Sequence, residues 1–353
     1  MKYDRFITAL STIVLLSFSS EAATPVIVPT FVQELHQKSF SSIIPGNYSG
    51  ITRISGNRYA VVDDKSPSDG FHFFDIDIDS ISGDILSATM SELITNDHPN
   101  RDGEGIVYVP SSNTLFISGE ADKRILEYKM DGSLTGRELQ IPSIFNSALP
   151  NSNFEALAYN PETHLFWTTT ESTLPIDGEP SSPNNGVRNI LRIQCFDEDM
   201  QPVRQYAYLM DAPVSTKNSS PYAMGVSEIT ALDDGQLIIL EREFIIPPSK
   251  FGARVNCKLY VVNPDEGEPL SNDKPLSDSS SFLKKTKLYE FKTSLTLASN
   301  QIANYEGMCL GPTLPDGNQT LILISDSQNH YGGVLKDWLK VIIISENKKK
   351  NNT

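Results

Sequence analysis

Cysteine is scarce in this chain, which has three such residues among 353 and no CxxC pair. Three cysteines are too few for a disulfide framework or a closed zinc site, so at most one disulfide bond is expected. Histidine is also rare, and no HxH or HExxH motif supports a zinc hydrolase. The GxSxG, GxxxxGK and GxGxxG motifs are missing, which excludes the usual serine hydrolase, P-loop and Rossmann signatures. Any catalysis must therefore use the acidic side chains.

Positive charge is also in short supply. The 29 Lys and Arg residues face 44 Asp and Glu residues, which leaves a formal net charge of -15. Such a chain repels a phosphate backbone, so we expect no nucleic-acid partner. A composition of 39% hydrophobic and 21% charged residues is typical of a globular protein with a real core.

Long apolar runs are missing except at the N-terminus. There Lys2 and Arg5 precede an apolar run at 7–18 and small residues that lead to a cleavage point after Ala22. This pattern predicts a signal peptide, the alternative being a membrane anchor, although the run is shorter than the ~20 residues that a span requires. We therefore expect a secreted or periplasmic monomer with no membrane span in its mature chain. The expected organisation is a signal peptide at 1–22, one folded domain at 23–346 and a disordered basic tail at 347–353.

What the sequence does contain is a short motif in five copies. Each copy begins an alternating apolar segment, passes a turn and enters a second segment rich in β-branched and aromatic residues, which is typical of a β-hairpin. The gaps between copies hold further strand-like segments, so each repeat is expected to have about four strands. The copies of this repeat motif are Ser49-Gly50-Ile51, Glu104-Gly105-Ile106, Glu155-Ala156-Leu157, Glu228-Ile229-Thr230 and Glu306-Gly307-Met308.

Repeats of this size without long helical patterns favour an all-β fold, a β-propeller with five or six four-stranded blades. A sixth blade would come from residues 201–210 or from the two chain ends closing together. The main alternative is a pair of β-sandwiches. Clusters of Pro, Ser, Asn and Asp predict long surface loops at 172–187, 211–225 and 264–283.

Four copies of the repeat motif begin with a glutamate, and four have Asn or Asp two residues earlier. Because residues i and i+2 of a strand face the same way, each blade offers a pair of oxygen-bearing side chains. Corresponding positions of successive blades converge on the propeller axis, so the sequence predicts a ring of carboxylates there. The glutamates are Glu104, Glu155, Glu228 and Glu306, and the earlier residues are Asn47, Asp102, Asn153 and Asn304.

A second tier of acids ends the second strand of each hairpin. Crowded carboxylates are unfavourable unless they are protonated or a cation compensates them. Oxygen-only ligation suits calcium or magnesium, and we expect Ca²⁺ because it accepts many oxygens in loose geometry. The alternative is that these acids are solvated strand ends or turn caps. The second tier comprises Asp63, Asp64, Glu120, Glu171, Glu241, Glu243 and Asp326.

Several basic residues lie near these acids. An arginine flanked by acids most often forms a solvated ion pair, and the alternative is that it clamps the anionic group of a substrate. The basic residues concerned are Lys65, Arg188, Arg192, Arg242 and Arg254. The three cysteines, Trp167 and Trp338 are expected in the core.

Taken in sequence order, the repeat motifs and the acidic segments that follow them resemble the phytase-like family, which is described as "esterase-like activity of phytase". This is a secreted bacterial group expected to be propellers. The resemblance covers roughly residues 45–330. Ser49 departs from the pattern, because it brings no carboxylate, so the first copy is not expected to bind metal. The motifs are Ser49-Gly50-Ile51, Asp102-Gly103-Glu104-Gly105-Ile106 with Ser118-Gly119-Glu120, Asn153-Phe154-Glu155-Ala156-Leu157-Ala158, Leu240-Glu241-Arg242, and Asn304-Tyr305-Glu306-Gly307 with Ser325-Asp326.

The resemblance implies a calcium-dependent phosphoester hydrolase that acts on a small phosphorylated or ester substrate. Because the chain is so acidic, cations would have to bridge its acids and the phosphate. Under this hypothesis the catalytic residues are Glu155, Glu306 and Arg242, and the substrate-binding residues are Arg188, Arg254 and Lys65. The metal ligands would be Glu104, Glu155, Glu228, Glu306, Asp326, Glu120, Glu171 and Asp64.

Two other functions stay open at this point. The ring could bind calcium for stability while the loops bind a surface protein or glycan, or the protein could be a metal-dependent lactonase or carboxylesterase in which the arginines are irrelevant. Arginines that face the ring would favour phosphate chemistry, whereas arginines scattered on outer strands would favour a binding module.

Overall fold

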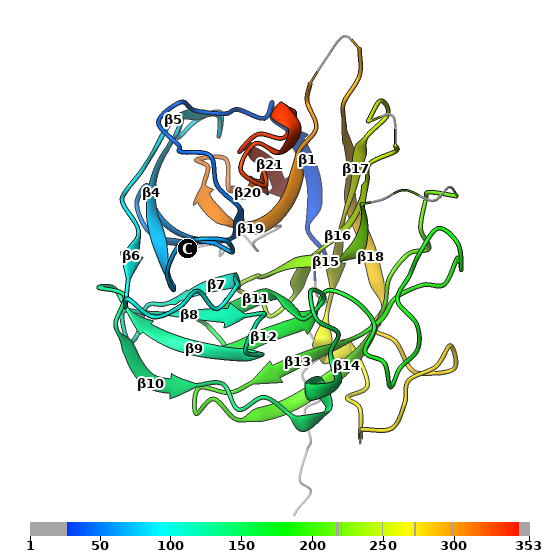
Figure 1. The fold of residues 1–353 in the computed structure, drawn as a ribbon. Helices are drawn as coiled ribbons and strands as arrows, with labels where there is room; N and C mark the ends of the chain where they lie inside the picture. Colours follow the sequence, from blue (N-terminus) through cyan, green and yellow to red (C-terminus); the bar gives the residue numbers. More distant parts are fainter. Residues whose placement is uncertain are drawn as a thin grey trace, which may run out of the picture.

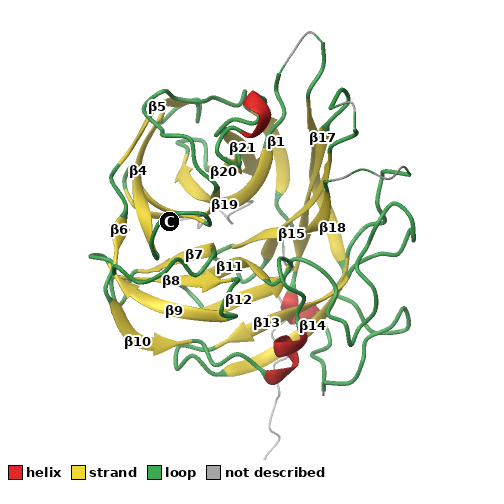
Figure 2. Ribbon diagram, in the orientation of Figure 1, coloured by secondary structure: helices red, strands yellow, loops and turns green. Residues whose placement is uncertain are grey.

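Each copy of the repeat motif lies in the first strand of a four-stranded antiparallel sheet. The computed structural model describes residues 27–345 except 217, 218, 220, 249, 272, 298 and 299, so the expected signal peptide and basic tail lie outside the described residues. Figures 1 and 2 show an almost entirely β molecule whose sheets follow one another around a central axis. The first strands of neighbouring sheets contact each other around that axis. The fold is therefore the predicted β-propeller, with five blades.

The blades follow the chain in order, and β6 (Ile94–Thr95) adds a short pairing to the first of them. The first blade is β2 (Tyr48–Ser55), β3 (Arg58–Asp63), β4 (Gly70–Ile78) and β5 (Ile85–Met90). The second blade is β7 (Gly103–Val109), β8 (Thr114–Gly119), β9 (Arg124–Lys129) and β10 (Leu134–Glu138). The third blade is β11 (Phe154–Asn160), β12 (Leu165–Thr170), β13 (Ile190–Phe196) and β14 (Pro202–Leu209). The last two are β15 (Tyr222–Ala231), β16 (Leu237–Ile245), β17 (Arg254–Val262) and β18 (Lys285–Ser294), then β19 (Asn304–Thr313), β20 (Asn318–Asp326), β21 (Leu339–Ser345) and β1 (Thr30–Glu34).

The two ends of the described chain close the ring. The strand β1 pairs antiparallel with β21, so Phe31 lies opposite Ile344 and the N-terminal strand becomes the outer strand of the fifth blade (Figure 1). Of the two predicted counts, five and six, the described residues form five blades, because residues 202–209 are β14 of the third blade. End closure thus completes a blade instead of adding one.

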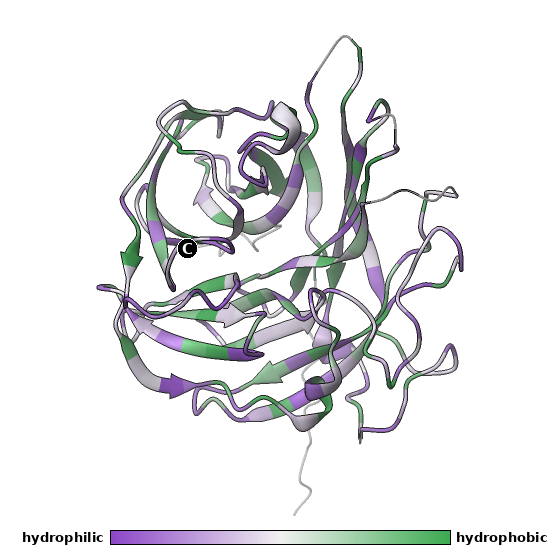
Figure 3. Cartoon of the chain, in the orientation of Figure 1, coloured by the Kyte–Doolittle hydropathy of each residue, from purple (hydrophilic) through white to green (hydrophobic). Residues whose placement is uncertain are grey.

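The core lies between neighbouring blades. Each sheet packs both faces against neighbouring blades, so inner strands such as β16 and β20 are buried along nearly their whole length. Figure 3 shows hydrophobic residues along the strands. One cluster joins Trp167 of the third blade to Leu237 of the fourth. The three cysteines, which are free, and Trp338 are buried, so the prediction of core positions is confirmed.

Two of the expected surface loops are more structured than their composition predicts. The loop at 172–187 buries Asp177, whose carboxylate pairs with Arg192 at 2.7 Å, and both side chains are fully buried. The loop at 211–225 ends early, because β15 begins at Tyr222. The amino-acid composition of a segment shows that it is polar, but it does not show whether its polar side chains are buried with hydrogen-bonding partners. The described helices are the short 3-10 turns η1 (Ser143–Ser147), η2 (Pro264–Glu266) and η3 (Tyr331–Gly333), and no helix of the described residues is long and apolar enough to cross a membrane.

Candidate functional site

The repeat motif coincides with a β-bulge in the first strand of every blade. In β11, Phe154 pairs with Thr170 and Ala156 pairs with Thr169, so Glu155 is the extra residue between them. A bulge breaks the ladder and redirects the side chain of the extra residue. By register, the same bulge position in the five blades is taken by Ser49, Glu104, Glu155, Ser227 and Glu306, which we call the first ring.

A second position recurs at the end of the second strand of each blade. In each blade, this position directly follows the second-strand residue that pairs with the residue just before the bulge. In the third blade, Phe154 precedes the bulge and pairs with Thr170, so the position is Glu171. The blade formed by β15–β18 has an arginine at this position, and each of the other four blades has a carboxylate. These residues, the second ring, are Asp64, Glu120, Glu171, Arg242 and Asp326.

Glu228 does not belong to either ring. The ladder pairs Val226 with Glu241 and Glu228 with Leu240, so Ser227 takes the bulge position and Glu228 lies one residue further on. Its carboxyl group is 1% exposed and accepts hydrogen bonds from the backbone N–H groups of Leu157 at 3.0 Å and Ile229 at 2.9 Å. The sequence predicts Ser227 at the bulge when the copies are aligned on the residue before the bulge, which is Val226 in this blade. An alignment on the glutamates places Glu228 there instead.

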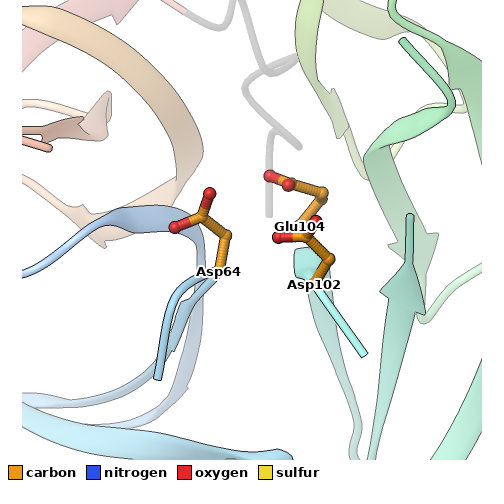
Figure 4. A group of neighbouring side chains, drawn as sticks. All are labelled: Asp64, Asp102 and Glu104. Carbon is orange, nitrogen blue, oxygen red and sulfur yellow. The ribbon is translucent and has the colours of Figure 1, made fainter. Parts of the chain in front are cut away.

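The closest group of acids lies between the first and second blades. Oxygens of Asp64, Asp102 and Glu104 lie within 4.8 Å of one another, and Figure 4 shows the two acids at β7 pointing toward Asp64. Ser49 donates a hydrogen bond to Glu104 at 2.6 Å, and the Lys65 ammonium lies 3.1 Å from Asp64 and also bonds Asp102. We call this group the three-acid cluster. The sequence predicts that Asp102 lies on the same face as Glu104, but the predicted metal ligands did not include it.

Arg242 holds the opposite side of the rings together. Its guanidinium donates to Glu171 at 2.6 Å, to Asn304 at 3.0 Å and to Glu306, and its side chain is 5% exposed. Asn304 also donates to Glu306 at 2.8 Å. Arg242 is thus a buried counter-ion for two ring acids.

The remaining acids crowd one another. Burial first, and neighbouring carboxylates second, raise the pKa of Glu104, Glu155 and Asp326 well above the ordinary range. Burial and then Glu306 raise the pKa of Asp64 to about 7. Burial also raises the pKa of Glu306, because it outweighs the attraction of its arginine partner. Such a group of buried acids therefore favours protonated acids or a compensating cation.

The donor set fits a hard divalent cation such as calcium. Eight carboxyl groups face two cationic groups, and no histidine or cysteine is among them, which suits oxygen-seeking ions. Asn47 and Asn153 also have buried side-chain oxygens without a hydrogen-bond partner, and both lie two residues before the first ring. The eight carboxyl groups belong to Asp64, Asp102, Glu104, Glu120, Glu155, Glu171, Glu306 and Asp326, and the two cations to Lys65 and Arg242.

Other predicted residues lie outside the rings. Arg188 is half-exposed and faces Asp278 at 3.8 Å, and Arg254 begins the third strand of the fourth blade. Glu241 accepts from the Tyr208 hydroxyl and Lys285, both at 2.6 Å. Glu243 accepts from backbone N–H groups of the 211–221 loop. These second-tier glutamates anchor a loop instead of facing the axis.

A separate cavity of about 440 Å³ is lined by residues that follow the bulges. Its wall includes the apolar residue two positions after the first ring in each blade, so it lacks the ring carboxylates. Because a cation needs carboxylate ligands, we place the candidate functional site at the acidic rings and not in this cavity. These apolar residues are Ile51, Ile106, Leu157, Ile229 and Met308.

Comparison with known proteins gives one family. The sequence model of the family described as "Phytase-like: Esterase-like activity of phytase" matches residues 44–328, whereas no curated protein matches the chain. Among solved structures, an endo-arabinase from Bacteroides thetaiotaomicron VPI-5482 shares 12% identity over 88% of this chain and 97% of that chain, with a TM-score of 0.47. A streptogramin B lyase shares 14% identity over 88% of this chain and 98% of that chain, with a TM-score of 0.37. At these TM-scores neither likeness carries an argument about this chain.

Proposed function

Because the chain belongs to the phytase-like family described by the esterase-like activity of phytase, we propose that it is a calcium-dependent hydrolase of small phosphoesters. The observation that carries the proposal is the excess of ring carboxylates over ring cations, together with two buried amide oxygens that lack partners. A purely structural role would leave no reason to concentrate uncompensated acids on the axis. We further propose export with cleavage near Ala22, which the intact mass of the exported protein tests.

The three-acid cluster and the neighbouring ring acids would hold the cation. When bound, the cation would offset the negative charge of the ester and act as a Lewis acid. The cluster supplies Asp64, Asp102 and Glu104, and the orphaned oxygens of Asn47 and Asn153 would complete the oxygen set. Calcium fits this set because it takes six to eight oxygens in flexible geometry.

Glu155 is the residue that would take a proton from the attacking water. Glu104 accepts from Ser49, and Glu306 accepts from Arg242 and Asn304, whereas no described residue donates a hydrogen bond to the Glu155 carboxyl group. Burial first, and Glu171 second, raise the pKa of Glu155, which makes its carboxylate a stronger base than an exposed one. Glu306 and Arg242 would hold the geometry of the site.

The positions of the arginines weaken the case for a phosphate clamp and leave two alternatives, a binding module and a hydrolase of carboxylic esters or lactones. Only Arg242 of the predicted substrate-clamping arginines lies in a ring, and it is already paired with Glu171 and Glu306. An uncharged ester needs no guanidinium clamp, so the same cation site would suffice for it.

A panel of phosphomonoesters, phosphodiesters, carboxylic esters and lactones, assayed in calcium and in chelator, tests the proposal. We expect calcium-dependent hydrolysis of phosphoesters that Glu155→Gln lowers by about a hundredfold, a typical contribution of one acid–base group. Hydrolysis of carboxylic esters alone would move the assignment to the hydrolase of carboxylic esters or lactones. No hydrolysis of any ester by the calcium-loaded protein would leave a calcium-stabilised binding module.

A further inference from the structure

Lys65 contacts the carboxylates that the proposed cation would need. Its ammonium lies 3.1 Å from Asp64 Oδ2 and bonds Asp102 Oδ1, and these two acids with Glu104 form the three-acid cluster. The ammonium is therefore the nearest positive charge to the cluster among the described residues, and it contacts two of the three acids.

Hydrogen bonds hold the backbone around Lys65 in place, whereas its side chain is held only by the contacts of its ammonium with Asp64 and Asp102. The Lys65 N–H donates to Asp63 Oδ1 at 3.0 Å, the Ser66 N–H bonds the Asp63 carbonyl at 3.1 Å, and the Asp64 N–H bonds the Asn47 carbonyl at 3.0 Å. The Lys65 side chain is 54% exposed, so its four-carbon stem can swing into water without breaking packing.

Arg242 provides the internal contrast. It is buried at 5% exposure and donates to Glu171, Asn304 and Glu306, so it cannot leave the rings without stranding buried acids. The site thus has one fixed cation and one that can leave.

We propose that the Lys65 ammonium is a resident counter-ion that a divalent cation displaces on binding, and that the released ammonium then meets the anionic group of the substrate. The inference rests on the proposed cation site. Displacement exchanges one positive charge for two at the same carboxylates, and the exposed ammonium regains water when it leaves. Lys65 therefore sets the calcium concentration at which the site fills, and keeps the acids compensated below it.

Calcium titration calorimetry on the whole protein tests this inference through a readout other than activity. Lys65→Met removes the competitor, so calcium should bind about two- to fivefold more tightly, which matches the strength of a half-exposed ion pair. Lys123→Met is the matched control. The Lys123 ammonium donates hydrogen bonds to the backbone carbonyls of Asn146 and Ala148 and to no ring acid. Its replacement therefore removes the same charge from the protein without freeing a ring carboxylate.

Each outcome of the titration has a separate meaning. Equal tightening in Lys65→Met and Lys123→Met, or none in either, overturns displacement by the cation. Absence of calcium binding to the unchanged protein instead overturns the proposed cation site. With calcium present, Lys65→Met should bind inorganic phosphate more weakly than Lys123→Met does. Equal phosphate affinity would overturn the second role of the released ammonium.

Discussion

Arg242 takes the second-ring position that carboxylates occupy in the other four blades. From the sequence, an arginine flanked by acids either forms a solvated ion pair or clamps an anionic group of the substrate, and the family resemblance implied a catalytic role for Arg242. Its guanidinium instead already binds Glu171 and Glu306. At the scale of single residues, its guanidinium neutralises two ring acids.

We expect Arg242→Met to lower the free energy of unfolding in chelator by about 3–5 kcal/mol, because it strands two buried carboxylates. The freed acids should attract the cation, so calcium should raise the melting temperature more in this variant than in the unchanged protein. Thermal melts in chelator and in calcium measure both effects.

Arg192→Met is the control for this prediction. Arg192 and Asp177 form a fully buried pair in the third blade, outside the rings. Its loss should cost a similar free energy and leave the calcium-induced rise unchanged. The same rise in both variants would mean that Arg242 does not govern cation binding.

At the scale of the element, the first strands approach one another so closely that the residue after the bulge is small in four of the five blades. A Cβ at Gly50 would lie 2.3 Å from the Glu104 carbonyl oxygen, and one at Gly307 would lie 2.2 Å from that of Ser49. In β15 this position holds Glu228. Its carboxyl group is buried against the backbone of β11 and bonds it, which joins the third and fourth blades.

We expect Glu228→Gln to keep most of the stability, since the amide oxygen can still accept from the N–H groups of Leu157 and Ile229. Glu228→Ala should lower the free energy of unfolding by about 2–4 kcal/mol, because two buried donors lose their acceptor. Calcium affinity should be unchanged in Glu228→Gln and reduced in Glu306→Gln. Calorimetric titration compares the two, and equal losses would return Glu228 to the metal ligands that its sequence motif predicts.

At the scale of the whole molecule, closure of the propeller concentrates acids that are far apart in the sequence. The rings draw on all five blades, from residues 49 to 326 of the chain. Stability in the absence of metal should therefore respond to proton concentration, and calcium should take over the role of the protons.

The metal-free protein should lose stability as pH rises. The pKa of Asp64 is raised from 3.8 to about 7 by burial and by Glu306, so the folded state binds its proton more tightly than the unfolded state does. Its contribution is fully present below about pH 4 and is lost as pH rises through about 7. The raised pKa values of Glu104, Glu155 and Asp326 act in the same direction.

Melting temperatures from about pH 5 to 8, in chelator and in calcium, measure this effect. In chelator the melting temperature should fall across the range, and calcium should flatten the dependence by replacing protons. Calcium at a hundred times its dissociation constant should add about 2.7 kcal/mol per site. Identical curves with and without calcium would contradict cation binding in the rings.

The sequence by itself determined the strands, the fivefold repeat and the identity of most ring acids. Period-two alternation and turn residues are local signals, so they predict hairpins without knowledge of strand pairing. Four of the first-ring positions could be found this way, at Ser49, Glu104, Glu155 and Glu306. The buried cysteines and tryptophans followed from the same patterns.

Tertiary structure alone decided the rest, because it depends on which residues pair across the sheet. A single-residue bulge in β15 places Ser227 instead of Glu228 at the axis, and the glutamate that the repeat motif shares does not reveal this register. The partners of Arg242 lie 71 and 64 residues away along the chain, so their contact exists only once the third, fourth and fifth blades close around the axis.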